Sequence, residues 1–492
     1  GDHRDLHRVD RRQRQMCIRD RDIRIGISAT SMGHGHILKA IPIKRALDEI
    51  GSFLRKRGIN IYSKILNEKN MLSPAAISVR DFIEMAYNAI STVPRLRIWL
   101  DKVTKSMDDR TIFIIERIVA RANRAAGGNT VRFDEFYPID AMISTHPSDR
   151  AVMLPKNTLI VRLDPDIFAH SFHFIPTKWM DEWYAVMDGR LRLSIVQGHE
   201  RALNPKYLPK NTDRIVSVGA MVHPANLRNL RKAMKLLKNK KMPVMFQIGG
   251  AGAQQDIYLE IMKHLDYNSI EPTFVASTHE EFFDKLLDQA LALSLITGKE
   301  HYLAKNRFMQ ELDYKGGIIR FSSGLKIQYC PKRYKSVEII DTIKTDNVLN
   351  VAKPGDVTNA SIPYLLLYHI GTQEIANGNW ATIKGFAEWL IPVDKYERMR
   401  KEMLPNALDI IYGRKAARRV NEIANDRRFL EEKYAALIKL DSKGAYNTAV
   451  LAILLALKRR GENIEKVYNI LRKKRLTTLD KSICDKINKN YD

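Results

Sequence analysis

The chain of 492 residues is long enough for two or three domains, and its 45% hydrophobic content is ordinary for a globular protein. A net charge of +25 points to an anionic partner, while three widely spaced cysteines exclude a disulfide framework or zinc pattern and favour a reducing cytoplasm. The longest strongly apolar run, residues 449–457, is far shorter than the roughly 20 residues that span a bilayer. We therefore expect a protein that can lie on a membrane without crossing it.

Residues 1–21 differ in composition from the rest of the chain. They are rich in Arg and Asp and show no apolar period, and residues 16–21 resemble translated sequencing-adapter DNA. The segment also lacks the apolar core of a signal peptide. We predict that it is not native sequence and leave it out of the fold prediction.

The next segment has the pattern of a strand, a turn and a helix. Residues 23–29 alternate like a strand, residues 30–36 form a glycine-bearing turn that ends at His36, and residues 37–50 have helical spacing. This order opens a Rossmann-like unit, which we predict as an N-terminal domain over residues 22–213. The turn does not have Gly-x-Gly-x-x-Gly spacing, so a dinucleotide is not expected.

A helical insert is predicted over residues 60–128. Its residues 86–101 mix aromatic and cationic side chains, including Tyr87, Arg95, Arg97 and Trp99. That composition suits an interfacial segment, with the rings among lipid headgroups and the cations toward anionic lipid. A helix that packs between domains is the alternative.

Two further strand ends carry residues that can transfer protons. Residues 141–146 end a strand at His146, and residues 158–164 lead into a turn at Asp164. Together with His36 they follow separate predicted strands, whose carboxyl ends converge in a doubly wound sheet. Any of the three could act as a general base, and the sequence does not choose among them.

A second Rossmann-like domain is predicted over residues 214–395. Its crossover segment contains Gly219 and His223, and residues 242–247 form a strand that leads to a glycine loop and a helix beginning near Gln255. Such a loop suits phosphate, because its amide groups and the helix N-terminus face the anion. The loop glycines concerned are Gly249, Gly250 and Gly252.

The most informative stretch is residues 350–380. Gly355 in a Pro-Gly turn lets backbone amides approach a ligand, and Thr358 offers a hydroxyl at an expected helix start. Residues 364–368 predict a buried strand, and polar side chains follow where that strand would end: Gln373, Glu374 and Asn377. A phosphate cradle followed by polyol-reading groups suits a nucleotide-sugar. The alternative is a strand with ordinary polar loops.

This stretch resembles a known donor site. Lys353-Pro-Gly-x-x-Thr, an apolar strand and Gly371-x-Gln-Glu-x-x-Asn resemble the diacylglycerol glycosyltransferases, a family that includes monogalactosyldiacylglycerol synthases and processive diacylglycerol glucosyltransferases. The resemblance implies the GT-B architecture, with two Rossmann-like domains that face each other across a cleft, and metal-independent transfer. It implies donor-binding roles for Gly219, His223, Gly249, Gly250, Gly252, Lys353, Gly355, Thr358, Gln373, Glu374 and Asn377.

The resemblance extends to the N-terminal half and has two departures. It places His36 of a Gly-x-Gly-His turn, His146 of Ser-Thr-His-Pro and Asp164 of an acidic turn at the reaction centre, and an aromatic and basic loop near the acceptor. The chain is shorter than the family after Thr358, where the family's ribose-holding Glu belongs, and Asn359 or Ser361 stands nearest. His223 stands where the family has an Arg.

Residues 396–492 predict a basic helical extension, and their densest cationic run, residues 472–475, could attract anionic lipid. We predict an α/β fold of two Rossmann-like domains and a function as a hexosyltransferase. It would use a UDP-sugar, a lipid or lipid-linked acceptor and an anionic membrane surface, as a cytoplasmic protein peripheral to the inner face of the cell membrane. No cofactor or metal is predicted. Basicity without a nucleic-acid-binding signature does not favour nucleic acid. The alternatives are a sugar-nucleotide 2-epimerase and a non-catalytic glycan- or lipid-binding descendant.

Overall fold

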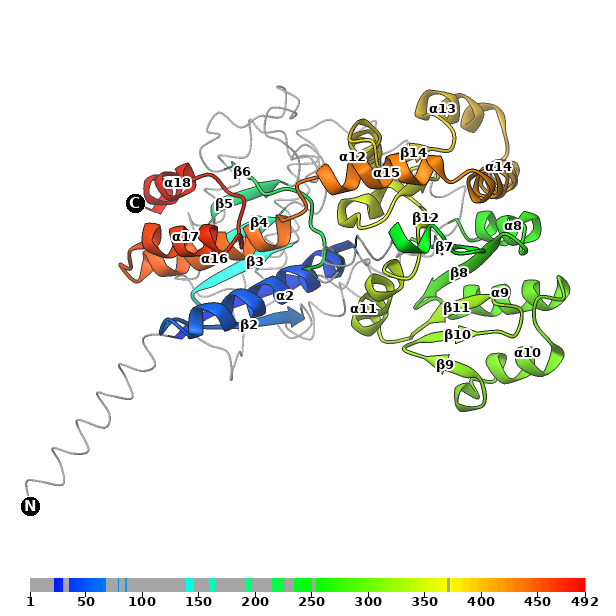
Figure 1. Ribbon diagram of the computed structural model, residues 1–492, viewed down its shortest axis with the longest axis horizontal. Helices are drawn as coiled ribbons and strands as arrows, with labels where there is room; N and C mark the ends of the chain where they lie inside the picture. Colours follow the sequence, from blue (N-terminus) through cyan, green and yellow to red (C-terminus); the bar gives the residue numbers. More distant parts are fainter. Residues whose placement is uncertain are drawn as a thin grey trace, which may run out of the picture.

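The computed structural model places two α/β domains side by side, the first on the left and the second on the right of Figure 1. Each domain is a sheet with helices packed against it. The residues that the structure describes are 22–29, 35–67, 78, 85, 139–145, 159–163, 191–196, 215–224, 226, 230, 234–249, 254–369 and 372–491.

Within those residues the first sheet has six strands, each parallel to its neighbours, in the spatial order β2–β1–β3–β4–β5–β6. All-parallel sheets are covered by helices on their faces, which is why β3 is buried throughout and β1 is buried from Ile25 onward. The strands are β1 (Asp22–Ala29), β2 (Asn60–Asn67), β3 (Ala141–Ser144), β4 (Leu159–Leu163), β5 (Leu191–Val196) and β6 (Ile215–Ser217).

The second sheet has eight strands in the described part of the chain, in the order β14–β13–β12–β7–β8–β11–β10–β9. The six strands from β14 to β11 run parallel, and β10 and β9 extend the sheet as antiparallel strands. The strands are β7 (Met242–Gln247), β8 (Ile270–Ser277), β9 (Asp313–Lys315), β10 (Ile318–Arg320), β11 (Lys326–Tyr329), β12 (Leu349–Ala352), β13 (Tyr364–Leu366) and β14 (Ala387–Trp389).

Helices of the second domain follow its strands along the chain. They are α8 (Gln255–His264), α9 (Glu280–Ala292), α10 (Gly298–Lys305), α11 (Arg333–Lys344), α12 (Thr372–Ile383), α13 (Val393–Glu402), α14 (Pro405–Asn425) and α15 (Arg428–Lys439), with the 3₁₀ helices η8 (Met309–Glu311) and η9 (Pro354–Asn359). Helix α14 packs on α8, and both contribute to the same core as the sheet, together with α15.

The first domain is completed by the two ends of the described chain. Helix α2 (Gly35–Arg55) packs on β1 and β2, and the C-terminal helices α16 (Gly444–Arg459), α17 (Ile464–Lys473) and α18 (Ser482–Tyr491) return to it from the second domain (Figure 1). Helix α16 is buried along most of its length against α2, β1, β3 and β4. The long apolar run near the C-terminus is therefore a core helix.

The chain crosses between the domains twice, and the two crossings touch. On the way out Ala220 donates its backbone N–H to Asp441 O at 2.9 Å, and on the way back Gly444 donates to Ala220 O at 3.0 Å. Gly219 has a φ of +84°, and a Cβ there would lie 2.7 Å from Asp441 O. Glycine is required at this position because both the backbone conformation and the close approach exclude a side chain.

The predicted α/β class with two Rossmann-like sheets and C-terminal helices is confirmed. One expectation is wrong: residues 60–67, assigned to a helical insert, form strand β2, paired with β1 along its whole length. Ile61 and Leu66 are buried, whereas Tyr62 and Lys64 point to solvent, as in a strand at the edge of a sheet. The remainder of the insert lies outside the described residues, apart from residues 78 and 85, and the domain boundaries stay predictions.

Candidate functional site

The second sheet reverses its strand order between β7 and β12. From β7 the chain adds β8 and β11 on one side, and it then returns to add β12, β13 and β14 on the other side. In open α/β sheets ligands bind outside the carboxyl ends of the strands at such a reversal, because the following loops diverge and leave a crevice there. The loops that follow β7 and β12 contain Gly249 and Lys353.

Lys353 lies across this reversal. It follows β12 directly, and its aliphatic stem packs on Gly249 after β7, where a Cβ would lie 2.8 Å from Lys353 Cδ. Its ammonium forms an ion pair with Glu374, in the first turn of α12. A Cβ on Gly355 would lie 2.7 Å from Lys353 Nζ and 2.8 Å from Glu374 Oε1. Two glycines thus make room for one ion pair, which is buried except for about a fifth of the lysine side chain.

The carboxylate that pairs with Lys353 lies at the start of a helix. Glu374 is in the first turn of α12, where the unpaired amides at a helix N-terminus favour a negative charge. Asn377 lies one turn further along the same helix and is fully buried. The sequence placed Glu374 and Asn377 at a strand end, and the structure puts them on the helix that follows β13. The same amides would favour the phosphates of a ligand.

A buried carboxyl group interacts electrostatically with both members of the ion pair. Asp356, next to Gly355 in η9, is buried, and burial raises the pKa of its carboxyl above the usual range, although the ammonium groups of Lys353 and Lys344 oppose the rise. Its Oδ2 has no hydrogen-bond partner among the described residues. This acid therefore retains a proton more readily than an exposed aspartate.

The carboxyl edge of the first sheet has a different chemistry. Its strand order reverses between β1 and β3, and there Thr145 Oγ1 donates to Ser28 O at 2.9 Å. His146 follows Thr145 along the chain, and Asp164 follows β4; both lie outside the described residues. His36 is the second residue of α2, and its side chain is also outside them. The three predicted catalytic residues thus follow β3, β4 and β1, which are adjacent strands.

The remaining predicted donor residues are only partly placed. Gly219 packs against Asp441 at the crossing between domains, and His223 lies at the end of that crossing, half-buried. Thr358 lies near the end of η9, so the expected helix start is wrong there, and its side chain is not described. The Gln373 side chain and the whole of Gly250, Gly252, Tyr87, Arg95, Arg97 and Trp99 lie outside the described residues.

A contact between the domains was not predicted from the sequence. Asn359, at the end of η9, donates through Nδ2 to the backbone oxygen of Leu38 at 2.7 Å, and its Oδ1 accepts from Lys39 Nζ. All the atoms concerned are buried, and α2 and η9 belong to different domains. A lysine at a buried position of an otherwise apolar helix face was the available signal, because such a cation needs a partner.

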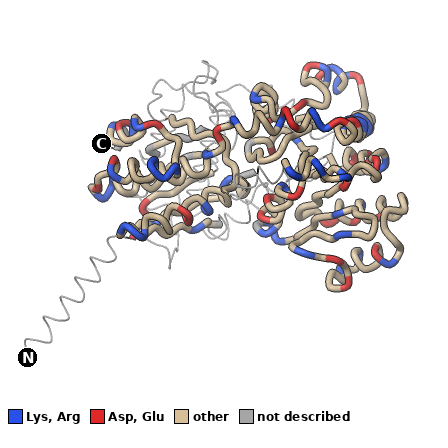
Figure 2. The backbone as a smooth tube through the Cα atoms, viewed as in Figure 1, with Lys and Arg blue, Asp and Glu red and all other residues tan. Residues whose placement is uncertain are grey.

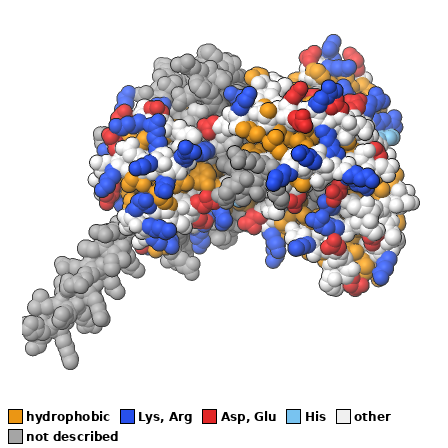
Figure 3. All heavy atoms as spheres, in the orientation of Figure 1, with side chains coloured by type: hydrophobic (Ala, Val, Ile, Leu, Met, Phe, Trp, Pro, Cys, Tyr) orange, Lys and Arg blue, Asp and Glu red, His pale blue; other side chains and the backbone are white. Residues whose placement is uncertain are grey.

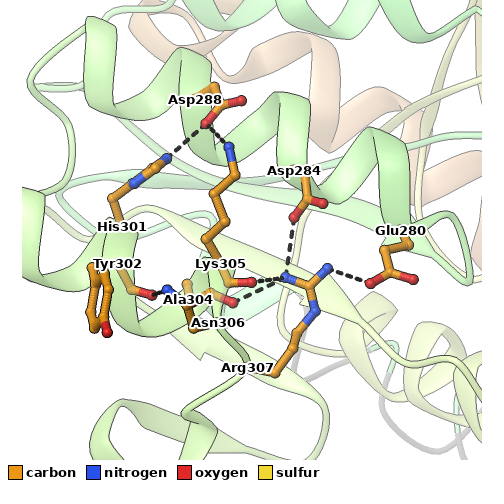
Figure 4. A network of polar contacts seen from close by, with 9 residues as sticks. All are labelled: Glu280, Asp284, Asp288, His301, Tyr302, Ala304, Lys305, Asn306 and Arg307. Carbon is orange, nitrogen blue, oxygen red and sulfur yellow. Dashed lines mark hydrogen bonds and ion pairs between the residues drawn. The ribbon is translucent and has the colours of Figure 1, made fainter.

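A second polar network joins α9 to α10 and to the turn after it (Figure 4). His301 and Lys305 both reach Asp288 Oδ1 at 2.7 Å, and Arg307 pairs with Asp284 at 3.1 Å and Glu280 at 2.9 Å. The acidic residues are spaced four apart on α9, so they form one stripe to which α10 and the following turn are tied. These charged side chains pair with one another and hold α10 and the following turn against α9.

No group of His, Cys, Asp and Glu among the described residues could hold a metal ion. Asp164 and Asp166 form an acidic pair outside those residues, so the prediction that no metal takes part stays untested. The site therefore contains three groups at one edge of the sheet: the Lys353 ammonium packed against glycines, the Glu374 carboxylate and the N-terminus of α12. These groups can bind an anionic, polyhydroxylated ligand.

No protein-family model matches the chain, and a search of curated proteins finds no match. Among solved structures, a UDP-GlcNAc 2-epimerase from Neisseria meningitidis bound to UDP-GlcNAc has 9% identity and a TM-score of 0.41, over 88% of this chain and 99% of that one. A glycosyltransferase from Rickettsia africae ESF-5 has 10% identity and a TM-score of 0.37, over 91% and 99%. The spinosyn rhamnosyltransferase SpnG has 12% identity and a TM-score of 0.39, over 87% and 98%. Because these scores are low, the description of the fold depends on the two sheets themselves.

Proposed function

We propose that the protein transfers a hexose from a UDP-sugar to a lipid or lipid-linked acceptor at the cytoplasmic face of a membrane. The observation that carries this proposal is the meeting of Gly249, Lys353, Gly355 and Glu374 at the strand-order reversal of the second sheet. These four residues come from three separate segments, the glycine loop, the Lys-Pro-Gly turn and the first turn of α12, and the fold brings them to the edge where α/β sheets bind ligands.

The proposed chemistry assigns a task to each group. The ammonium of Lys353 and the amides at the α12 N-terminus stabilise the charge that grows on the departing UDP. Glu374 accepts hydrogen bonds from the sugar hydroxyls, and its existing pair with Lys353 fixes its orientation before the donor arrives. A base from the first sheet, His36, His146 or Asp164, takes the proton of the acceptor hydroxyl.

A membrane contact is supported by charge and exposure in the second domain. Helix α13 exposes Lys395, Arg398 and Lys401 together with two acids, Glu402 and Asp394, the latter paired with Arg398 at 3.6 Å; Leu404 follows and is 70% exposed. Cations beside an exposed apolar side chain suit an anionic lipid surface. Figure 3 shows Lys and Arg side chains on both domains, interspersed with Asp and Glu, and Figure 2 marks the Lys and Arg positions along the helices of both domains. Among the described residues, no helix combines the length and apolar character that a membrane span requires.

Donor binding is tested first by thermal shift across a set of UDP-sugars, because a ligand of the native state raises its stability by mass action. Calorimetry with the best donor then compares Gln373→Ala and Glu374→Ala with Glu402→Ala, an exposed acid on α13. Each of the first two should weaken binding by roughly 1.5–3 kcal/mol, because a hydrogen bond to the sugar is lost, and the control should not. Unchanged affinity in both would contradict the assigned roles.

The lipid part is tested by co-sedimentation with vesicles of anionic or neutral lipid. Binding to the anionic vesicles should weaken as salt rises, because exposed charges are screened within about 10 Å at 0.1 M salt. Equal binding to both kinds of vesicle would count against an anionic membrane partner. A 2-epimerase of the same fold would bind the UDP-sugar and ignore both.

One observation favours a second candidate, a non-catalytic protein that binds a glycan or lipid. Asn359 and Ser361 stand nearest to the family's ribose-holding Glu, and both are engaged: the Asn359 amide bonds α2, and Ser361 Oγ accepts from Asn226 Nδ2 at 3.4 Å. Both side chains are buried. Absence of any response to nucleotide-sugars, with vesicle binding intact, would favour this candidate.

A further inference from the structure

The contact between α2 and η9 joins the two domains through side chains. The Asn359 amide is bonded on both sides by a single stretch of α2, to the Lys39 ammonium and to the Leu38 carbonyl. Lys39 is 2% exposed and Asn359 3% exposed, so water does not compete for these bonds. In such surroundings an amide or ammonium left without a partner is unfavourable, which makes the pairing specific in register. We call Leu38, Lys39 and Asn359 the α2–η9 contact.

A third side chain explains why a lysine is tolerated here. Asp356 stands three residues before Asn359 in η9, and in a 3₁₀ helix residues three apart lie on the same side. Its carboxyl interacts electrostatically with Lys39 from the other domain. The lysine neighbours on α2, Ile37, Leu38 and Ala40, are buried apolar residues. The cation on one domain therefore matches an amide and a carboxyl on the other.

We propose that Lys39 and Asn359 are positioning residues that hold the first turns of α2 against η9. Lys39 lies three residues after His36, and Asn359 directly follows Thr358, so the contact joins the segments that carry the predicted acceptor-side and donor-side groups. The naming of those two sides rests on the proposed function. The α2–η9 contact does not rest on the proposed function, because its hydrogen bonds join two domains and involve no ligand.

The contact complements the other link between the domains. Residues 218–222 and 441–444 pair where the chain crosses twice, and that pairing attaches the two domains at one place. The α2–η9 contact lies elsewhere on the boundary, beside Val337 of α11, which packs into the core of the first domain. The crossing, the α2–η9 contact and the packing of α11 on α2 are attachments within the described part of the chain, and together they restrict the orientation of the domains more than the crossing alone.

The test measures the distance between the domains without any substrate. Spin labels are placed at Lys56→Cys and Lys299→Cys, two exposed positions on the first and second domain, in a Cys17→Ser background; Cys330 and Cys484 are buried. Pulsed electron–electron resonance should give a narrow distance distribution for this protein. Asn359→Leu and Lys39→Met should each broaden or shift it, because each removes a buried hydrogen bond between α2 and η9. Lys44→Met should not, because Lys44 pairs only with Asp48 on the exposed side of the same helix.

Circular dichroism and a cooperative unfolding transition establish that each variant is folded, and Asn359→Ala, which only shortens a side chain, replaces any variant that is not. Unchanged distributions in the folded variants of both positions would overturn the proposal. With a responsive donor, the variants should lower kcat about tenfold or more and leave donor affinity within about threefold, a split that lost stability alone does not produce. If the protein binds no UDP-sugar, the proposed function is wrong. The distances between the spin labels would still decide the role of the α2–η9 contact.

Discussion

The carboxyl edges of the two sheets share one topology but differ in the side chains described at them. Each sheet reverses its strand order beside its first strand, between β1 and β3 in one domain and between β7 and β12 in the other. At the second reversal a lysine and a glutamate pair over two glycines. At the first, the described residues supply hydroxyl and backbone groups, with Thr145 bonded to Ser28. The same topology thus carries a buried ion pair at the second reversal, and among the described residues at the first it carries a hydrogen bond from a hydroxyl to a backbone carbonyl.

From this difference we expect the two edges to have different roles, one in donor binding and one in proton transfer. A charged group that is already paired and buried holds its geometry when an anionic ligand arrives, which suits binding of a donor diphosphate. The first edge is followed along the chain by His36, His146 and Asp164, whose side chains can transfer a proton. We therefore expect variants at the first edge to affect turnover and variants at the second edge to affect donor affinity.

The largest effect is expected at the first edge. Replacing His36 by Ala should lower turnover about 10²- to 10⁴-fold, the usual loss when a positioned acid–base group is removed, and should leave donor affinity nearly unchanged. His34→Ala is the matched control in the same turn and should do much less. Steady-state kinetics and donor calorimetry measure the two effects separately. A turnover within about threefold of wild type for His36→Ala would transfer the role to His146 or Asp164.

A smaller effect of the opposite kind is expected at the second edge. In Gly355→Ala the new Cβ would lie 2.7 Å from Lys353 Nζ and 2.8 Å from Glu374 Oε1, so the ion pair must shift. Donor affinity should fall roughly 10- to 100-fold, because both groups lose their positions. Gly298→Ala, where a Cβ meets nothing within 4 Å, is the control. Equal donor affinity in the two variants would remove the second edge from the binding site.

The smallest effect should come from a charge cluster outside both edges. Glu260 on α8 is 8% exposed and bonds Arg414 of α14 at 2.8 Å, Lys263 at 3.1 Å and His264 at 3.0 Å. Burial acts to raise its pKa, but the bonds from Arg414, Lys263 and His264 lower it to about 2, from an ordinary value of 4.5. Because the folded pKa is the lower one, the stabilisation is complete above pH 4.5 and disappears as the pH falls through about 2.

Glu260→Gln should therefore reduce the free energy of unfolding by about 1–2 kcal/mol near neutral pH, and by less in acid. Urea denaturation across that range measures the difference between wild type and variant. Donor affinity and turnover should be unchanged, which distinguishes this cluster from both edges. A difference that stays constant from neutral pH to about pH 2 would contradict the assigned pKa.

Local sequence patterns predicted most of the elements near the site. Alternation over residues 23–29, helical spacing over residues 37–50 and the apolar run after Pro363 predicted β1, α2 and β13, and the structure has all three. The glycine loop predicted the start of α8 near Gln255. These predictions succeed because the period of apolar residues reports which face of a single element is buried. The strand β2 was mistaken for helix because, at the sheet edge, its polar and apolar residues do not give a clear period.

The partners of each group were decided by the tertiary structure alone. Lys353 meets Gly249 and Glu374 because β12 lies beside β7 and α12 starts above the same edge, although the three residues are far apart in the sequence. The C-terminal helices divide between two cores because the chain crosses the domain boundary a second time near Gly444. The sequence pattern around Asn359 is that of a polar loop, and only the packing of the two domains brings its side chain into contact with α2. Such contacts depend on strand order and domain orientation, and local periodicity contains no information about either.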